Sequence, residues 1–353
     1  MKKVLWLGPI VNPDNISDHK AVSPAANKWQ INFINALQRN DVQIVNLSYL
    51  PEPKYPKGKL FPIYKHKVRT ISNVQSKYIN IPFIKNRSLS NSLKKNITKF
   101  KTADIIITYN SYVPHINAAK YAVSKYNMKW VNIVADDQCV EGPDLTVFLS
   151  YGYYHDSDIS SKMHIDGGLY SLESTTDEFN KNVLIFTGAL NKWTGIEKFA
   201  HDFSKLNIDK FELHIFGKGN SLQLTRLAQA NRNIKIKGFV SEEELESNMK
   251  KCFAFVNPRP IDIDGSENNF PSKLLEYFKY GKPILSTKTA GVAPYYDDLL
   301  MFYDPNNLNS LDNALKILTN FTEEDRCLLR KRISDFSKSH SWDSLAKLFI
   351  ESI

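Results

Sequence analysis

Short apolar runs alternate with helical patterns along most of this 353-residue chain. Runs typical of buried β-strands lie at 2–8, 42–48, 104–109, 129–135, 145–151, 182–190, 211–217, 234–240, 253–258, 283–287 and 299–304. Amphipathic helical patterns fit between many of them, at 25–38, 115–126, 195–205, 221–230, 242–251, 271–280 and 307–319. This alternation predicts an α/β protein whose parallel sheets are covered by helices on both faces.

The length and one polar seam predict two domains. A chain of this size corresponds to about two domains at ~150 residues each. Residues 164–181 are polar and rich in turn formers, with little periodicity. We therefore expect one domain over 1–170 and a second over 171–340, followed by a helix over 341–353.

Residues 51–101 interrupt the first domain and carry its basic character. The formal net charge of the chain is +9, yet this segment holds thirteen Lys or Arg and one acid, Glu52, so the remaining residues sum to about −3. Prolines fall among the lysines before a helical pattern near 88–101. We expect a long loop that attracts an anionic partner: a membrane face, a lipid-linked phosphate or nucleic acid. The alternative is a solvated, lysine-rich surface.

The sequence contains few features that indicate a cellular compartment or a metal site. No run of 18 apolar residues predicts a membrane span, and MKKVLWLGPIV is better explained as a first strand than as a signal peptide. Cys139, Cys252 and Cys327 lie far apart without metal-ligand spacing, so we expect buried thiols in a reducing cytoplasm.

The segment 253–287 contains the strongest candidate residues for a ligand-binding site. A buried strand ends at Asn257–Pro258, a polar loop follows, and a helix opens near Pro271. The start of that helix offers free N–H groups to a phosphate, with Ser272 and Lys273 in its first turn. Glu276 shares their face about 6 Å along the axis, where a ribose beside a bound diphosphate would lie.

Arg259 follows the preceding strand at its carboxyl end, where open α/β sheets bind ligands. Its guanidinium is suited to hold a phosphate through two hydrogen bonds. The alternative for Lys273 and Glu276 is an ordinary surface ion pair. The combination nevertheless predicts a site for a nucleoside diphosphate.

Polar positions in the first domain are further candidate site residues. Gly8 follows the first strand and is expected to border a cleft between the domains, and Asn27 lies in the first turn of the next helix. We expect Asn27 either to touch a phosphate of a bound ligand or to be a surface residue.

At this point the sequence resembles a known family. FPSKLLEYFKYGKPIL (270–285) is similar to the donor-site signature of GT-B glycosyltransferases, especially the retaining family 4 enzymes. FTGALNKWTGIEKFA, FELHIFGKGN and IKIKGFVSEEELESNMKKC resemble other parts of the same donor domain. GPIVNPDN and IVADD give a weaker match in the first half. The resemblance implies a GT-B fold, two Rossmann-like domains with parallel sheets facing an interdomain cleft, and a last helix that returns to the first domain.

The resemblance also implies roles for individual residues. The donor-binding set becomes Gly188, Lys192, Gly217, Val240, Arg259, Glu267, Ser272, Lys273 and Glu276. In the first domain, Asp136 and Asp137 end a strand where related enzymes often carry a histidine near the acceptor hydroxyl. Asp136 is then expected to orient that hydroxyl or act as a base, unless it is a turn or cap aspartate. The expected catalytic residues are Asp136, Arg259 and Lys273.

Two departures from the family pattern stand out. The family usually has a glutamate where this chain has Asn268, with Glu267 one residue out of register. Ala189 and Thr194 occupy the places of the family's usual Arg and Lys, and Lys192 lies between them. A metal is not expected, because the cationic groups and the helix start neutralise the leaving diphosphate. Asp262 and Asp264 have metal-ligand spacing but are better explained as a solvated loop.

The expected function is glycosyl transfer with retention, from a nucleotide sugar such as a UDP-sugar to a glycan or lipid-linked acceptor, in surface polysaccharide or glycoconjugate synthesis. No cofactor and no nucleic acid partner are expected. The expected location is the cytoplasm, at the inner face of the membrane. The alternatives are a catalytically degenerate GT-B protein that acts as a binding partner, and a nucleotide-sugar epimerase.

Overall fold

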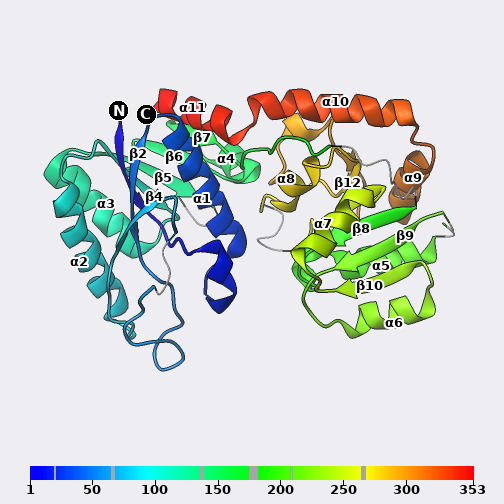
Figure 1. The fold of residues 1–353 in the computed structure, drawn as a ribbon, viewed down its shortest axis with the longest axis horizontal. Coiled ribbons are helices and arrows are strands. Elements are labelled where there is room, and N and C mark those ends of the chain that lie inside the picture. Colours follow the sequence, from blue (N-terminus) through cyan, green and yellow to red (C-terminus); the bar gives the residue numbers. More distant parts are fainter. Residues whose placement is uncertain are drawn as a thin grey trace. The chain divides into compact units, whose positions relative to one another are not determined.

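The chain forms two compact units (Figure 1). Our computed structural model describes residues 1–353 apart from 20, 65–67, 136–138, 175–181, 207, 209, 264–267 and the side chain of Ser17. Unit 1 comprises residues 1–149, 156–168 and 342–353, and unit 2 comprises residues 150–155 and 169–341.

Unit 1 is built on a parallel sheet of seven strands in the order β3-β2-β1-β4-β5-β6-β7. The strands are β1 (Lys3–Leu7), β2 (Gln43–Ser48), β3 (Ser72–Gln75), β4 (Ile105–Tyr109), β5 (Lys129–Val134), β6 (Leu145–Phe148) and β7 (Lys162–His164). The central strands are buried along their length, which is why their sequences are nearly continuous apolar runs.

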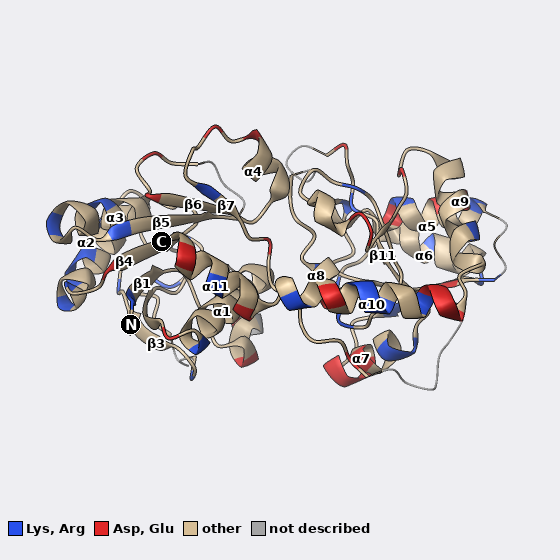
Figure 2. Cartoon of the chain, turned by 90° about the horizontal axis from the view of Figure 1, so that it is seen from above, with Lys and Arg blue, Asp and Glu red and all other residues tan. Residues whose placement is uncertain are grey.

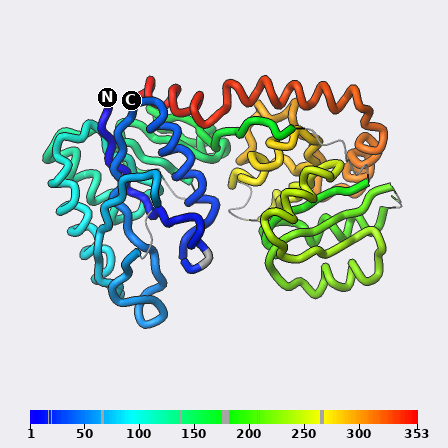
Figure 3. Tube along the Cα trace, in the orientation of Figure 1, coloured from blue at the N-terminus to red at the C-terminus, as the bar shows by residue number. Residues whose placement is uncertain are grey.

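The helices of unit 1 include one from the far end of the chain. They are α1 (Pro24–Arg39), α2 (Lys85–Ile97), α3 (Val113–Tyr126) and α11 (Trp342–Ser352), with 3-10 turns η1 (Pro13–Asp18) and η2 (Thr98–Phe100). Aromatic contacts fix α11 on α1, with 5.3 Å between the ring centroids of Phe33 and Phe349. The two termini therefore lie close together (Figure 3), and the Lys2 ammonium donates to the Ile353 carbonyl at 2.6 Å.

Unit 2 contains a parallel sheet of six strands in the order β10-β9-β8-β11-β12-β13. The strands are β8 (Val183–Thr187), β9 (Glu212–Phe216), β10 (Ile234–Gly238), β11 (Ala254–Asn257), β12 (Ile284–Ser286) and β13 (Met301–Phe302). The helices are α4 (Tyr151–Asp156, whose last residue belongs to unit 1), α5 (Ile196–Lys205), α6 (Leu222–Ala230), α7 (Glu242–Lys251), α8 (Lys273–Phe278), α9 (Leu308–Thr319) and α10 (Glu323–Ser339), with 3-10 turns η3 (Lys192–Thr194) and η4 (Pro294–Tyr296).

Each face of this sheet has its own core. Leu184 packs into a cluster with Phe199 of α5 and Leu315 of α9. Its neighbour Ile185 packs into a second cluster with Leu274 of α8. Because successive side chains of a strand point to opposite faces, β8 is buried on both sides. The predicted fold, parallel sheets covered by helices on both faces, is confirmed.

The structure differs from the expected elements in a few places. The apolar run 145–151 is not one strand, because β6 ends at Phe148 and α4 begins at Tyr151. Strands β3 and β7 were not anticipated: they are three or four residues long, lie at the sheet edges and lack the apolar side chains of a buried strand. The expected helix over 88–101 starts earlier, and α2 begins at Lys85.

The cysteine prediction is wrong for two of the three residues. Cys252 is buried, whereas Cys139 and Cys327 are exposed thiols. In the part of the chain that the structure describes, no helix is long and apolar enough to cross a bilayer.

A buried histidine lies in the core of unit 1. The His115 side chain is 1% exposed, its Nδ1 lies 3.2 Å from the Tyr109 carbonyl oxygen, and its ring contacts Tyr49 and Tyr112 edge-on. Nε2 has no hydrogen-bond partner among the described residues. Burial lowers the pKa of His115 from 6.5 to about 4, because a charged ring would lose its hydration there.

This pKa predicts that unit 1 loses stability in mild acid. Between pH 6.5 and 4 the unfolded state binds a proton that folded His115 does not, so the free energy of unfolding rises with pH over this window. At pH 5 the loss relative to pH 7 is about 2 kcal/mol. Urea unfolding of the wild type and of His115→Asn at both pH values measures it. An equal pH dependence in the two proteins would contradict this assignment.

Candidate functional site

The strand order of unit 2 reverses direction between β8 and β11. From β8 the chain proceeds outward to β9 and β10, and it then returns to β11 on the other side of β8. In open α/β sheets the crevice at the carboxyl ends of two such strands is where ligands bind. The segments that leave these ends are 188–195 after β8 and 258–263 after β11.

Two glycines allow the loops after β8 and β9 to touch through their backbones. Gly217 has φ +148°, and a Cβ there would lie 1.6 Å from the Gly188 carbonyl oxygen. The Gly217 N–H donates to the Gly238 carbonyl at 2.8 Å, and the Gly188 N–H donates to the Phe216 carbonyl at 3.0 Å. Only glycine fits Gly217, both for its φ and for the space available.

Gly195 and Arg259 tie the first loop to the end of β11. Gly195 has φ +70°, and a Cβ there would lie 1.7 Å from the Pro258 carbonyl oxygen. Arg259 donates from Nη1 to the Trp193 carbonyl at 3.1 Å, and its own carbonyl accepts from the Thr287 hydroxyl at 2.6 Å. Burial lowers the pKa of the Arg259 guanidinium, which stays cationic near neutral pH because an arginine pKa starts above 12.

Tyr277 holds α8 against the end of β8. Its hydroxyl accepts the Thr187 N–H at 3.0 Å and lies 3.1 Å from the Thr187 hydroxyl. Its ring stacks on Phe255 of β11, with centroids 4.4 Å apart and planes 6° apart. Burial raises the pKa of the Tyr277 hydroxyl, which therefore stays protonated. Since Glu276 is the adjacent residue, this anchor fixes its backbone relative to the glycine loop.

The predicted first-turn residues of α8 form an ion pair. The Lys273 ammonium lies 2.6 Å from a carboxylate oxygen of Glu276, and both side chains are about one-third exposed. The hydroxyl of Ser272, the residue before the helix, is exposed and makes no capping bond. The ordinary ion pair that we kept as an alternative is therefore present, at the position expected for the donor site.

The junction that leads into α8 is braced by residues that the sequence did not single out. The Ser150 hydroxyl donates to the Asn268 carbonyl, and a Cβ on Gly291 would lie 2.6 Å from the Asn269 carbonyl oxygen. A Cβ on Gly152 would lie 2.6 Å from the Asn268 side-chain oxygen. The only sequence signal was a glycine in each of two segments to which no role was assigned, and for Ser150 and Gly152 the partner lies more than 100 residues away.

The remaining donor-side candidates have different surroundings. Lys192 is exposed, and its ammonium lies 4.7 Å from the centroid of the Trp193 ring. Val240, after β10, packs against the core cluster of α8. Asp262 is exposed, whereas Asp264 and Glu267 lie outside the described residues. Within the described ranges, no group of three or more His, Cys, Asp or Glu side chains is placed to hold a metal.

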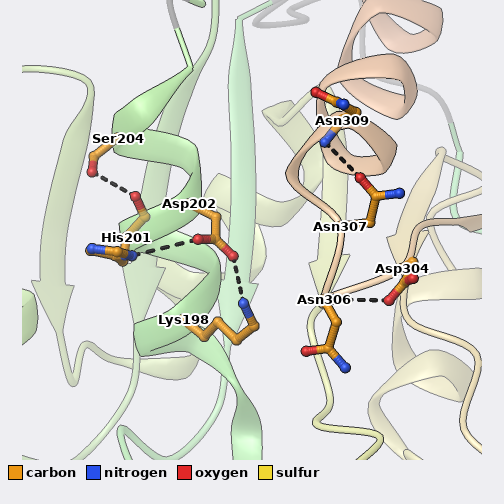
Figure 4. A network of polar contacts seen from close by, with 8 residues as sticks. All are labelled: Lys198, His201, Asp202, Ser204, Asp304, Asn306, Asn307 and Asn309. Carbon is orange, nitrogen blue, oxygen red and sulfur yellow. Dashed lines mark hydrogen bonds and ion pairs between the residues drawn. The ribbon is translucent and has the colours of Figure 1, made fainter.

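A pocket of about 190 Å³ lies beside this site, between the first turns of α5 and the loop before α9. Lys198 and Asp202 form an ion pair at 2.9 Å on its α5 side (Figure 4). On the other side Asp304 accepts the Asn306 N–H at 2.8 Å. Lys198, Asp202 and Asn306 are among the residues that line the pocket.

In unit 1, the structure gives Asn27 a clear local role. Asn27 is 2% exposed, accepts the Val11 N–H at 2.9 Å and donates to the Val11 carbonyl at 3.0 Å. It is not a surface residue, and it holds the loop that follows β1. Gly8 lies on that loop, where a Cβ would meet the Gln30 side chain at 2.0 Å. Asp136 and Asp137 lie outside the described residues.

Comparison with known proteins agrees with this geometry. Residues 181–320 match the family model of the glycosyl transferases group 1. The matched region contains the glycine loops, Arg259 and α8 described above. A search of the curated proteins finds no match to this sequence.

Solved structures similar to this chain show that both units together have the GT-B fold. Sucrose-phosphate synthase from Thermosynechococcus elongatus is 13% identical, with a TM-score of 0.67, over 99% of this chain and 98% of that one. The lipopolysaccharide outer core galactosyltransferase WaaB is 15% identical, with a TM-score of 0.68, over 99% and 98%. Anabaena HepE, solved with UDP and glucose, is 14% identical, with a TM-score of 0.64, over 100% of both chains.

The close approach of Gly217 to the Gly188 carbonyl yields a prediction. Gly217→Ala forces apart the loops after β8 and β9 and lowers the free energy of unfolding by about 3 kcal/mol. Gly238→Ala is the matched control, because Gly238 also has a positive φ (+71°) but no atom lies within 4 Å of its Cβ position. It costs about 1–2 kcal/mol. Urea unfolding midpoints compare the two, and equal losses would contradict the close contact.

Proposed function

We propose that this protein is a glycosyltransferase that moves a sugar from a nucleoside diphosphate sugar, a UDP-sugar, to a glycan or lipid-linked acceptor. The observation that carries the proposal is that the glycine loop, Arg259 and helix α8, which is tied to β8 through Tyr277, are brought together at the strand-order reversal in the region that matches the group 1 glycosyltransferase model. The complex of HepE with UDP and glucose supports the choice of donor.

Within this proposal each donor-side residue has a task. The backbone at Gly188 and Gly217 and the Ser272 hydroxyl face the diphosphate, and Lys192, Arg259 and Lys273 neutralise it. Glu276 accepts both ribose hydroxyls, Val240 contacts the base, and Glu267 contacts the transferred sugar. These are the tasks that the family resemblance implies for these positions.

The ion pair between Lys273 and Glu276 does not oppose this assignment. An exposed pair contributes about 0–1 kcal/mol, because solvent screens it and its side chains lose freedom. A hydrogen bond to a charged group contributes about 1.5–3 kcal/mol. Exchanging the internal pair for a ribose and a phosphate is therefore favourable, and the pair keeps both side chains oriented before the donor arrives.

The proposed chemistry is transfer with retention and without a metal. Negative charge grows on the diphosphate as the bond to the sugar breaks, and Arg259 and Lys273 stabilise it most strongly in the transition state. The leaving phosphate accepts the proton of the acceptor hydroxyl on the same face of the sugar. Asp136 is the proposed group that orients the hydroxyl, and Asp137 and Gly8 are the other residues proposed to face the acceptor. Asn27 is proposed to act on that side only through the loop after β1, because both polar atoms of its amide are bonded to Val11.

The transfer reaction is proposed to be a step in surface polysaccharide or glycoconjugate synthesis, and to take place at the cytoplasmic face of the membrane. The lysine-rich segment 51–101 supports this through its +12 charge.

A panel of nucleotide sugars, with and without acceptor, tests the reaction class through release of nucleoside diphosphate. A degenerate binding protein shows no turnover, and an epimerase changes the sugar without an acceptor. Activity lost in a chelator would contradict metal independence.

The site assignment predicts separate losses from three variants. Glu276→Gln lowers UDP affinity about tenfold, because the ribose loses a charged acceptor. Arg259→Lys and Lys273→Gln lower kcat roughly 100-fold, because the developing charge on the diphosphate loses a fixed partner. Isothermal titration with UDP and initial-rate kinetics measure these effects.

A surface pair elsewhere supplies the control. Lys338 and Asp335 on α10 also lie three residues apart, with a nitrogen–oxygen distance of 2.6 Å. Lys338→Gln and Asp335→Asn should leave UDP affinity and kcat unchanged. If Glu276→Gln behaves like these controls, α8 is not the donor site.

A further inference from the structure

Exposed apolar side chains are concentrated in the basic segment of unit 1. Six large ones are solvent-exposed here: Tyr55, Phe61, Ile63, Ile79, Phe83 and Ile84. Phe83 is fully exposed and Phe61 is 60% exposed. A run of such side chains on one surface segment marks an interaction site rather than an ordinary solvated loop.

The two stretches that carry them, 52–63 and 77–87, are held together by one buried residue. Asn80 is 0% exposed and is hydrogen-bonded to four residues of the first stretch: Pro53, Tyr55, Lys59 and Leu60. The Lys85 ammonium adds a bond to the Glu52 carbonyl at 3.1 Å. The backbones of the two stretches are therefore fixed relative to each other.

Basic side chains are interleaved with these apolar ones. The exposed cations of the two stretches are Lys54, Lys57, Lys59, Lys77 and Arg87. None of them forms an ion pair with a carboxylate among the described residues, and Glu52 is the single acid between 51 and 101. Lysines continue along α2 and α3 (Figure 2). We call the six apolar and five basic side chains the apolar–basic patch.

The patch lies at the carboxyl edge of the unit 1 sheet. Its first stretch follows β2, which ends at Ser48, and its second follows β3, which ends at Gln75. The loop after β1 leaves the same edge of this parallel sheet. A pocket of about 680 Å³ opens beside the patch, and His19, Lys57 and Lys59 line it together with the acids Asp18 and Glu52.

We propose that the apolar–basic patch docks unit 1 onto an anionic lipid bilayer. Phe61, Ile63, Phe83 and Ile84 enter the headgroup region, and the lysines and Arg87 contact lipid phosphates. This proposal rests on the membrane location given in the proposed function and names the residues that make the contact. It does not depend on the donor chemistry of unit 2. A bilayer is the partner whose chemistry matches both features, because it offers negative charge above an apolar layer.

The composition of the patch argues against nucleic acid as the partner. Single-stranded nucleic acid is bound by cations together with aromatic rings on which bases stack. Three of the six apolar side chains, Ile63, Ile79 and Ile84, are aliphatic and provide no stacking surface. Phe83 has a positive φ (+68°), which is disfavoured for a large residue. Its ring is fully exposed and does not pack in the core of unit 1.

Vesicle co-sedimentation of the full chain tests the proposal. The probes are phosphatidylcholine vesicles and vesicles that also contain phosphatidylglycerol, without any nucleotide sugar. At low salt, binding is expected to the anionic vesicles and not to the phosphatidylcholine vesicles. In 1 M salt the binding to anionic vesicles should weaken strongly, because charges are screened within ~3 Å. Equal binding to both vesicle types, no binding to either, or stronger binding to a single-stranded oligonucleotide would overturn the proposal.

Two paired variants separate the charge from the apolar contact. Lys57→Gln/Lys59→Gln lowers the partition coefficient roughly 25-fold, at about fivefold for each lysine. Phe61→Ser/Phe83→Asn lowers it about tenfold or more, and asparagine tolerates the positive φ at 83. The controls are Lys331→Gln/Lys347→Gln and Leu222→Ser/Leu348→Ser, which change exposed residues outside the patch. If the two patch variants lose no more vesicle binding than the two controls, the apolar–basic patch is not the membrane-binding surface.

The same variants distinguish this proposal from the donor assignment. All four should bind UDP with wild-type affinity, because none touches the donor loops of unit 2. Vesicle binding without UDP binding would remove the donor proposal and keep the patch. UDP binding without vesicle binding would do the reverse.

Discussion

The carboxyl edge of the unit 2 sheet depends on backbone atoms of different loops lying in direct contact. The carbonyl oxygens of Gly188 and Pro258 occupy the places where side chains of Gly217 and Gly195 would begin. A larger residue at either glycine would push a loop away, because its Cβ would overlap that oxygen. The loops after β8, β9 and β11 are consequently packed backbone to backbone. Under the proposed function, N–H groups held in place in this way are what a developing diphosphate charge requires.

A second layer of interactions transmits this rigidity to α8. That helix is only six residues long, so it cannot orient itself by its own hydrogen bonds. The Tyr277 hydroxyl on Thr187 and the Tyr277 ring on Phe255 supply the orientation from the sheet. At the start of the helix, Ser150 and Gly291 brace the junction at 268–269. The exposed side chains of Lys273 and Glu276 therefore project from a backbone that is held at two places.

Unit 1 is built on a parallel sheet of the same kind, and buried amide side chains shape the loops that follow its strands. Asn27 engages both polar atoms of its amide with Val11, so it shapes a loop rather than presenting a free group to a ligand. Asn80 has a similar role in the apolar–basic patch, where one buried amide joins two stretches that are far apart in sequence. In both places a buried polar side chain that satisfies backbone groups fixes a surface built from loops.

The sequence by itself determined the series of strands and helices, because buried parallel strands and amphipathic helices leave local patterns, and it singled out the segment 253–287 as a candidate site. It missed β3 and β7, whose short polar stretches become strands only by pairing at a sheet edge. It also missed Tyr277, Gly152 and Gly291, since their partners are not their neighbours along the chain. Tertiary structure alone decided that Asn27 is buried, that two cysteines are exposed and that apolar side chains stand among the lysines of 51–87. Periodicity reports whether a segment has a buried face, whereas the identity of what covers each face is a long-range property of the fold.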